Sequence, residues 1–509
     1  MVKYTLLHKP RFSGWPTIPR QLKIILAITV FTAASFFIIA QSSTRAKLIE
    51  LYNLQESLAV IFDLELKYMP DIEINELWLP VGVPQGHIYS AYLDMRPEVV
   101  LNYKHLNYSR ETTWAEIRII AVLDLERNDK PLMCHYKYKN DGTTDFVFER
   151  RPATKVKAMD ENWNLKYSAF FVLCDLTLPK HLDYATLYNK NHFPVGVTIS
   201  EDRGVDNDEY TGKPEKVPFV NITYPMRGTI HYYENDMFLS VCVPALHSNY
   251  NRALFFVEFI EYYLMMGAGH FTFYNSSVSP EVNKILEYYT NNGIATTLQW
   301  KLPPYYIYEK TLRDEGIFAA LNDCMYRSSY YRNYKYVAGV DVDEFLIPRV
   351  HNNFYELMRY LDPEEPERPR NRHASFLFRN AFFYTIHDDD LVNKDTSVPY
   401  LYTQAKTQRV KTINEPRYRS KYIVRSQDVV ELGNHNVWEF RKGFDEVAVD
   451  TDIALSHHYR YCEGDTVKCY LTKVTVDKTA HRFTKKLGQK VRSSCQNIFG
   501  SAGCPKPTD

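Results

Sequence analysis

The 509-residue sequence lacks several features that would each indicate a particular class of protein. Its 61 Lys and Arg residues balance 61 Asp and Glu residues, so charge gives no indication of a nucleic-acid partner. It has no Cys-x-x-Cys pair, which leaves a zinc or thioredoxin-like site without support. It shows neither a nucleophile elbow nor an obvious carboxylate pair of a retaining enzyme, which disfavours a hydrolase. Internal repeats and long low-complexity tracts are also missing.

One long hydrophobic run is present, close to the N-terminus. Ile24–Ala40 carries no charge, and it follows a basic segment that contains Lys3, Lys9, Arg11, Arg20 and Lys23. A basic segment before an apolar span keeps the N-terminus in the cytosol. We therefore predict a cytosolic tail at 1–21, a transmembrane anchor at 22–40 and a luminal remainder. The span is short, which suits a thinner membrane of the secretory pathway; a cleaved signal peptide is the alternative.

The cysteines agree with a luminal location. All 8 lie after the hydrophobic run, and an even number of cysteines in an oxidising compartment predicts disulfides. The spacing leaves their pairing open. Glycosylation acceptors at Asn107, Asn221 and Asn275 fit the same side of the membrane.

The segments that follow the anchor differ in pattern. Residues 41–80 carry leucines at helical spacing and are predicted to form a stem. Residues 81–223 contain short β-rich runs separated by turn residues, which predicts an antiparallel, sandwich-like domain. Cys134 and Cys174 each lie inside one of its predicted strands. Residues 201–218 are acidic and poor in apolar residues, which indicates a linker.

Strands and helices alternate in the next part of the chain. The pattern predicts strands at 238–243, 271–274, 294–300 and 336–340, with helices at 251–266, 280–292 and 311–327. We expect Glu258 and Glu261 on the exposed face of the first helix, and a capping box from Thr311 to Asp314 at the start of the third. This alternation predicts an α/β domain with a doubly wound parallel sheet over 231–485, followed by a C-terminal tail at 486–509.

The last predicted strand ends in Asp341-Val342-Asp343-Glu344. Carboxylates at i and i+2 of an extended chain point to the same side, so Asp341 and Asp343 can converge on one hard cation. Other D-x-D sequences occur, but this one follows a strand-like run and precedes more apolar chain. A divalent ion at a strand end can grip and neutralise a diphosphate leaving group, which indicates a nucleotide-sugar transferase.

These segments resemble glycosyltransferase family 92. The resemblance covers most of 238–460 and rests on Val241–Pro244, Phe256–Tyr262, Phe271–Asn275, Leu286–Tyr289, Ala319–Cys324, Asp341–Pro348, Lys421–Arg425, Gly433–His435 and His457–Arg460. It implies a GT-A-type, Rossmann-like fold and a single-pass type II Golgi membrane protein. It also implies a UDP-sugar donor, Mn²⁺ or another divalent cation, and inversion with transfer of galactose to a glycan acceptor on protein or lipid. One departure is Glu315-Gly316-Ile317, where the family pattern leads us to expect His-Gly-Gln.

The resemblance also implies roles for individual residues. Asp343 is the expected metal ligand, together with Asp341 and His458. The donor is expected to contact Asp341, Asp323, Arg419, Lys421 and His435. An inverting transfer needs a carboxylate that takes the proton of the acceptor hydroxyl, and Glu431 is our first choice. Glu439, Asp388, Asp389 and Asp390 are the alternatives.

Two other functions fit the same fold. The chain could be a catalytically weak or silent glycan-binding scaffold, or a transferase that uses UDP-GlcNAc, UDP-glucuronate or UDP-GalNAc. The missing Gln at Ile317 leaves both open. The β-rich domain could serve acceptor selection or act as a support of the stem.

Overall fold

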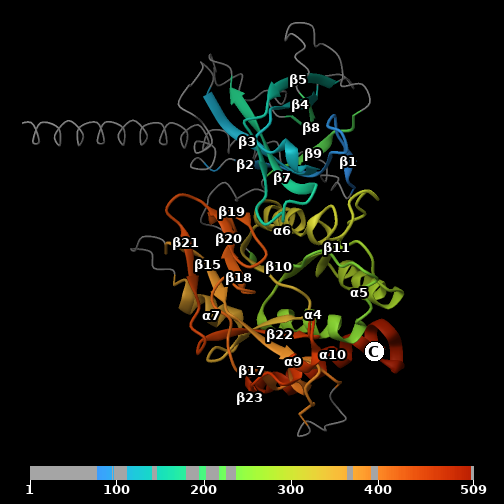
Figure 1. Ribbon diagram of the computed structural model, residues 1–509, viewed down its shortest axis with the longest axis vertical. Coiled ribbons are helices and arrows are strands. Elements are labelled where there is room, and N and C mark those ends of the chain that lie inside the picture. The colour runs from blue at the N-terminus through green and yellow to red at the C-terminus, as the bar shows by residue number, and fades with distance from the viewer. Residues whose placement is uncertain are drawn as a thin grey trace, which may run out of the picture. The chain divides into compact units, whose positions relative to one another are not determined.

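The computed structural model describes residues 77–94, 96, 112–139, 146–178, 194–201, 217–224, 237–363, 371–390 and 399–505 (Figure 1). All the described residues belong to one compact unit. The predicted tail, anchor and most of the predicted stem lie outside the described residues. None of the described helices is long and apolar enough to cross a membrane.

The β-rich part contains one nine-stranded sheet with the order β5-β4-β8-β9-β2-β3-β7-β6, and β1 pairs with β2. Its strands are β1 (Leu79–Pro80), β2 (His87–Asp94), β3 (Thr112–Asp124), β4 (Leu132–Lys139), β5 (Phe146–Pro152), β6 (Lys155–Ala158), β7 (Tyr167–Leu178), β8 (Gly196–Glu201) and β9 (Val220–Thr223). A disulfide joins Cys134 of β4 to Cys174 of β7, although four strands separate them in the sheet. The sheet therefore folds back on itself, with apolar side chains inside.

The second part is built on a seven-stranded sheet with the order β12-β11-β10-β13-β18-β15-β21. Its strands are β10 (Met237–Cys242), β11 (His270–Asn275), β12 (Ala295–Gln299), β13 (Tyr334–Gly339), β15 (His373–Phe378), β18 (Lys421–Arg425) and β21 (Asp445–Ala448). The first four are mutually parallel where they pair, as predicted, and β18 runs antiparallel to β13. The order reverses between β10 and β13, and ligands bind beyond the strand ends at such a point.

Helices cover both faces of this sheet. The described helices of this part are α4 (Ala253–Met266), α5 (Pro280–Asn291), α6 (Ile317–Tyr326), α7 (Phe354–Leu361), α8 (Tyr402–Ala405), α9 (Thr466–Tyr470) and α10 (Thr484–Phe499). α4 and α10 share one hydrophobic core, whereas α6 contributes to the other. Ser279 caps α5 as its spacing predicts, and its side chain accepts a hydrogen bond from Val282 N.

The prediction that Glu258 and Glu261 face solvent is wrong. Glu258 accepts hydrogen bonds from the backbone N–H groups of Tyr402 and Thr403. Glu261 accepts from the Tyr289 and Ser494 hydroxyls, and both carboxylates are buried. Segments from later in the chain cover the face of α4 that was expected to be exposed. α10 is therefore part of this domain, although the sequence analysis placed it in a tail.

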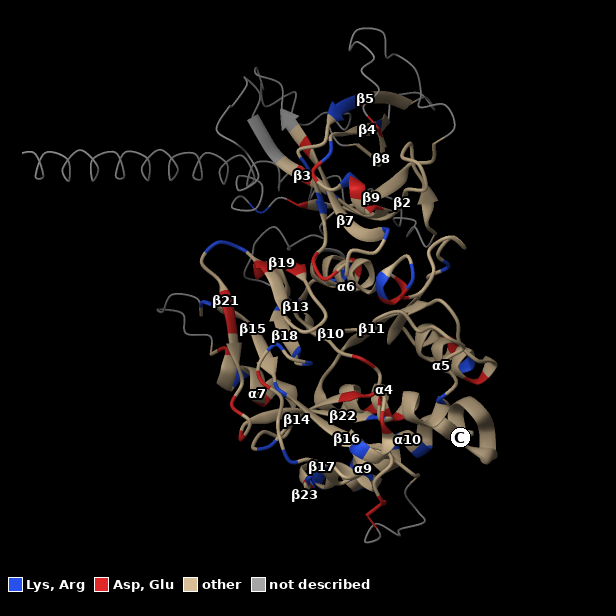
Figure 2. Ribbon diagram, in the orientation of Figure 1, with Lys and Arg blue, Asp and Glu red and all other residues tan. Residues whose placement is uncertain are grey.

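Smaller sheets complete the domain. A three-stranded sheet has the order β14-β22-β16, with β14 (Glu344–Pro348), β16 (Asn380–Tyr384) and β22 (Ala454–Arg460). Two antiparallel two-stranded sheets pair β17 (Gln408–Val410) with β23 (Val474–Val476), and β19 (Val429–Leu432) with β20 (Val437–Phe440). Lys and Arg are interspersed with Asp and Glu over both folded parts, in agreement with the balanced composition (Figure 2).

The two folded parts share a hydrophobic core. Trp78, Tyr89 and Tyr92 of the β-rich part belong to the same buried cluster as Trp300 and the side chains of α6. The Tyr92 hydroxyl donates to the Asp323 carboxylate over 2.6 Å. Apolar contact and a buried hydrogen bond thus fix the β-rich part against the helix that precedes β13.

All 8 cysteines pair, as the even number predicted. The bonds are Cys134–Cys174, Cys242–Cys324, Cys462–Cys469 and Cys495–Cys504. The second joins the end of β10 to α6.

We expect the Cys495–Cys504 bond to stabilise the end of the chain. Replacing both cysteines with serine should lower the free energy of unfolding by about 2–3 kcal/mol, because the bond closes a short loop and holds α10 in the core. Denaturant titration under non-reducing conditions measures the change. Gln496→Ser, an exposed position of the same helix, controls for helix propensity. A double variant as stable as the wild type would show that core contacts alone hold α10.

Candidate active site

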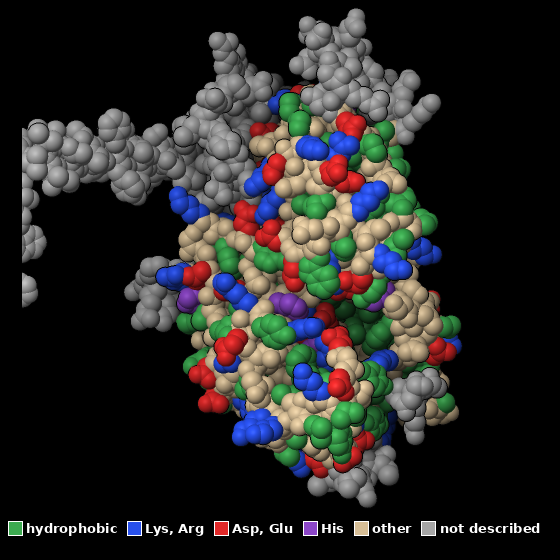
Figure 3. Space-filling view, viewed as in Figure 1, with side chains coloured by type: hydrophobic (Ala, Val, Ile, Leu, Met, Phe, Trp, Pro, Cys, Tyr) green, Lys and Arg blue, Asp and Glu red, His purple; other side chains and the backbone are tan. Residues whose placement is uncertain are grey.

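A cavity of about 850 Å³ opens at the carboxyl ends of β10 and β13. Figure 3 shows a hollow in the middle of one face, with histidine and charged side chains at its edge. The cavity is lined by residues of both folded parts: Glu161, Trp163, Val243, Pro244, Ala245, Leu246, His247, Tyr250, Tyr308, Glu309, Arg313, Asp314, Ile317, Asp341, Val342, Asp343, Glu344, Arg417, Tyr418, Arg419, Asn434, His435, His458, Arg460 and Glu463. Its position matches the predicted ligand site of a doubly wound sheet.

The turn between β13 and β14 carries the acidic residues of the predicted motif. The Asp341 N–H donates to the Glu344 carboxylate over 3.2 Å, and the Glu344 N–H donates to the Asp341 carbonyl over 3.0 Å. These bonds hold Asp341 and Asp343 at the cavity with side chains 34% and 37% exposed, whereas Glu344 is buried. Two carboxylates are thus presented to a ligand and a third supports them from behind.

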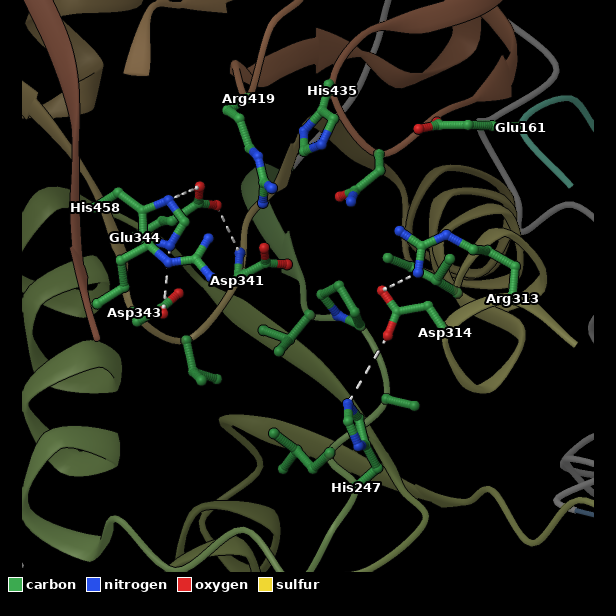
Figure 4. A pocket seen from close by; sticks show the side chains of 18 of the residues that line it. Glu161, His247, Arg313, Asp314, Asp341, Asp343, Glu344, Arg419, His435 and His458 are labelled. Carbon is green, nitrogen blue, oxygen red and sulfur yellow. Dashed lines mark hydrogen bonds and ion pairs between the residues drawn. The ribbon is translucent and has the colours of Figure 1, made fainter. Parts of the chain in front are cut away.

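His458 reaches this turn through strand pairing. β14 and β22 are antiparallel, and their register places His458 opposite Glu344. Its Nε2 lies 3.4 Å from the Asp343 carboxylate, and its Nδ1 lies 3.0 Å from the Glu344 carboxylate (Figure 4). Burial lowers the pKa of His458, but the two carboxylates outweigh burial and raise that pKa to about 9. For Asp343, burial alone would raise the pKa. The neighbouring His458 outweighs burial and holds the pKa of Asp343 below its ordinary value.

Lys421 lies behind the acidic turn and does not line the cavity. Its Nζ lies 3.1 Å from Asp341 and 3.3 Å from Glu344, and it donates to the Asn434 side-chain oxygen over 2.7 Å. The side chain is only 1% exposed. Burial opposes its charge, but the carboxylates raise the pKa of Lys421 above its ordinary value. The structure therefore gives Lys421 the role of holding the carboxylates, where we expected direct contact with the donor.

Two other predicted donor contacts do line the cavity. Arg419 lies at its wall, where its guanidinium is 3.5 Å from Glu463. His435 lies nearby; burial and then Lys421 lower its pKa to about 3, so the ring is neutral. The buried Nδ1 of His435 has no hydrogen-bond partner within the part of the chain that the structure describes. The sequence analysis assigned no role to Arg460, which also lines the cavity. Arg460 stands two residues after His458 on β22, so the two side chains lie on the same face of the strand.

Asp323 and Glu431 lie outside the cavity lining. Asp323 is fully buried on α6, where it pairs with Arg327 and accepts from the Tyr92 and Tyr274 hydroxyls. Glu431 is fully buried on β19 and pairs with Lys157 of the β-rich part. Both therefore hold elements together, and neither lines the cavity. The alternative bases also lie outside the lining: Glu439 pairs with Lys157, Asp389 with Lys406, Asp390 with Lys478, and Asp388 is exposed.

The opposite end of the cavity contains residues that the sequence analysis assigned elsewhere. The helix predicted to start at Thr311 begins at Ile317, because Asp314 and Glu315 adopt left-handed conformations with φ of 44° and 53°. The Trp300 indole donates to the Glu315 carbonyl over 2.7 Å and fixes this turn. Asp314 thereby points into the cavity (Figure 4), and Ile317, the position of the expected Gln, lines it.

Known proteins are similar to the part of the chain that carries this site. The family model described as glycosyltransferase family 92 matches residues 238–499, which contain the sheet and the acidic turn. The chain belongs to glycosyltransferase family 92. It is therefore a glycosyltransferase, as the resemblance predicted. The match extends through α10 and includes the helix that the sequence analysis had assigned to a tail.

Two relatives of this family 92 glycosyltransferase come from Caenorhabditis elegans. It is 24% identical over 351 residues to beta-1,4-galactosyltransferase galt-1, which covers 64% of this chain and 69% of that protein. It is 34% identical over 116 residues to glycosyltransferase family 92 protein F13G3.3, over 20% of this chain and 22% of that protein. A mycobacterial protein of known structure is 13% identical, covering 54% of this chain and 77% of the other, with a TM-score of 0.23.

Proposed function

We propose that this glycosyltransferase moves galactose from UDP-galactose to a glycan acceptor on protein or lipid, with a divalent cation and with inversion at the anomeric carbon. The observation that carries the proposal is the acidic turn at the switch point of the sheet, where Asp341 and Asp343 face a cavity and His458 adjoins them. The relative named beta-1,4-galactosyltransferase supports galactose as the sugar. The predicted anchor, pairing of all cysteines and resemblance support a type II location in the Golgi membrane.

The residues beside the turn fit a divalent cation such as Mn²⁺. Asp343 offers a carboxylate and His458 an imidazole nitrogen, both suited to a borderline cation. The other ring nitrogen of His458 lies 3.0 Å from Glu344, and a carboxylate in that position orients a histidine ligand. Across the described ranges, no three His, Cys, Asp or Glu side chains already converge on one metal position. A cation held there would neutralise charge on the diphosphate as it leaves.

The remaining residues of the cavity have roles that follow from charge. Asp341 faces the donor ribose or sugar in this proposal, since Lys421 holds its carboxylate at the cavity. Arg419 and Arg460 supply fixed positive charge beside the developing charge of UDP. The acceptor hydroxyl attacks from the face opposite UDP and gives its proton to a carboxylate. Among the described acidic residues, those that line the cavity are better candidates than the buried Glu431 for the base that takes this proton.

Release of UDP by the full-length chain tests the proposal. The assay uses UDP-galactose, UDP-GlcNAc, UDP-glucuronate and UDP-GalNAc with mixed glycan acceptors, and each is run with Mn²⁺ and with EDTA. We expect turnover with UDP-galactose that EDTA abolishes and Mn²⁺ restores. The anomeric configuration of the product, read by NMR, checks inversion.

A glycan-binding scaffold is the second candidate function. Its support is that Ile317, which stands where the family pattern suggests Gln, lines the cavity and offers no hydrogen bond to a sugar. Glycan binding without Mn²⁺-dependent UDP binding or turnover would favour the scaffold. Turnover with another UDP-sugar would retain the enzyme and change the donor.

A further inference from the structure

The cavity has a second end that the proposed chemistry leaves unassigned. It is formed by His247 after β10, by Arg313 and Asp314 before α6, and by Glu161 and Trp163 from the loop between β6 and β7 of the β-rich part. In Figure 4 Asp343 and His458 lie on one side, Arg313 and Asp314 lie on the other, and Asp341 lies between them. Residues of both folded parts thus enclose one end of the same cavity.

The order of these side chains matches the order of groups in a nucleotide donor. Asp343 and His458 mark the diphosphate, and Asp341 faces the ribose in the proposed function. The base is attached to the ribose on the side away from the diphosphate. Continuing from Asp343 past Asp341 leads to Asp314, so the second end lies where the base is expected.

The Asp314 carboxylate can accept a hydrogen bond from a ligand at this end of the cavity. It lies 3.7 Å from Arg313 and 3.9 Å from His247, and both distances exceed a hydrogen bond. Arg313 is itself held by Glu309. Uracil carries an N3–H donor, whereas N3 of cytosine is an acceptor. A carboxylate in this place therefore discriminates between the two pyrimidines, because only one can donate to it.

Trp163 offers an aromatic face at the same end. Its side chain is 59% exposed, unlike the buried Trp78 and Trp300. The Arg313 guanidinium lies over one face of the indole, 3.8 Å from the ring centroid, and so fixes its orientation. A base stacks on such a surface whatever its hydrogen-bonding pattern.

Both segments at this end have strained backbones. Glu161, Trp163 and Asn164 have φ of 60°, 56° and 54°, and Asp314 and Glu315 are also left-handed. Non-glycine residues in this region cost free energy and concentrate at ligand sites. The Asn162 side chain accepts from Asn164 N–H over 2.9 Å, which helps to hold the loop that presents Trp163.

We propose that this end of the cavity is the nucleobase subsite of the donor, in which the Asp314 carboxylate accepts the N3–H of uracil and the Trp163 indole stacks on its ring. The inference rests on the proposed use of a UDP-sugar. It gives the β-rich part a role in donor binding, beyond the acceptor selection or support of the stem considered from sequence.

Calorimetric titration of UDP and CDP into the full-length chain tests this assignment, with Mn²⁺ present and no acceptor. The wild type should prefer UDP. Asp314→Asn should weaken the binding of UDP about tenfold. It should also bring the affinities for UDP and CDP close together, because the Asn amide can donate a hydrogen bond to N3 of cytosine. Trp163→Ala should weaken the binding of both nucleotides by a similar factor of about ten, whereas Trp163→Phe should keep most of the wild-type affinity. The UDP-to-CDP ratio does not depend on the fraction of folded protein.

Two substitutions outside the cavity serve as controls. Asp452→Asn removes an exposed carboxylate, and Tyr360→Ala removes an aromatic side chain that is also 59% exposed. Neither should change nucleotide binding. Unchanged UDP affinity in both Asp314→Asn and Trp163→Ala overturns the subsite but leaves the proposed function intact. A Trp163→Ala variant that alters only the KM for the acceptor also overturns it. If the wild type binds no UDP, the donor proposal fails and the subsite fails with it.

Discussion

Replacing Asp343 with alanine is expected to lower the rate of sugar transfer about a thousandfold. The carboxylate faces the cavity and adjoins His458, so its loss removes a cation ligand and the charge stabilisation that the cation gives to departing UDP. The fold should survive, because the side chain is partly exposed and Glu344 and Lys421 keep their own contacts. Initial rates with UDP-galactose and saturating Mn²⁺, together with thermal unfolding, measure both effects.

Asp452→Ala is the matched control for this variant. Asp452 belongs to another D-x-D sequence, Asp450-Thr451-Asp452, but it is exposed and does not line the cavity. Its substitution should leave the rate within about twofold of the wild type. An Asp343→Ala enzyme that keeps its rate and its dependence on Mn²⁺ would show that the cation is held elsewhere.

The central sheet is predictable from sequence because its signals are local. Short apolar runs mark β10 to β13, helical periodicity marks the segments between them, and Ser279-Pro280 marks the start of α5. The burial of Glu258 and Glu261 is different, since it depends on α8 and α10, which come much later in the chain. Periodicity describes one helix and contains no information on segments that cover it later.

The site shows the same division between local and distant information. Asp341 and Asp343 are found by a pattern within one turn, and His458 is found through the family resemblance. Asp314 was assigned to a capping box, since Thr311-x-x-Asp314 fits that pattern. A tertiary hydrogen bond from Trp300 holds a different turn there. Trp163 comes from another domain, and no local pattern relates it to the acidic turn.

Lys421→Met is expected to destabilise the protein by about 3 kcal/mol. Lys421 and Glu344 are both buried, and removing one member of a buried ion pair leaves the other charge uncompensated. His458 remains 3.0 Å from Glu344 and limits the loss to the lower end of the usual range. Denaturant unfolding measures the stability. Transfer should also weaken, because Asp341 loses the contact that holds it at the cavity.

Lys406→Met provides the comparison for this effect. Lys406 is also buried, but its partner Asp389 is 41% exposed and can return to water, so we expect a smaller loss. Adding Glu344→Gln to Lys421→Met should recover at least about 1 kcal/mol, since the uncompensated charge is removed. Activity should stay low in the double variant, because Asp341 is still unsupported. If Glu344→Gln recovers no stability, the destabilisation comes from lost packing of the Lys421 side chain, and the buried charge is not its cause.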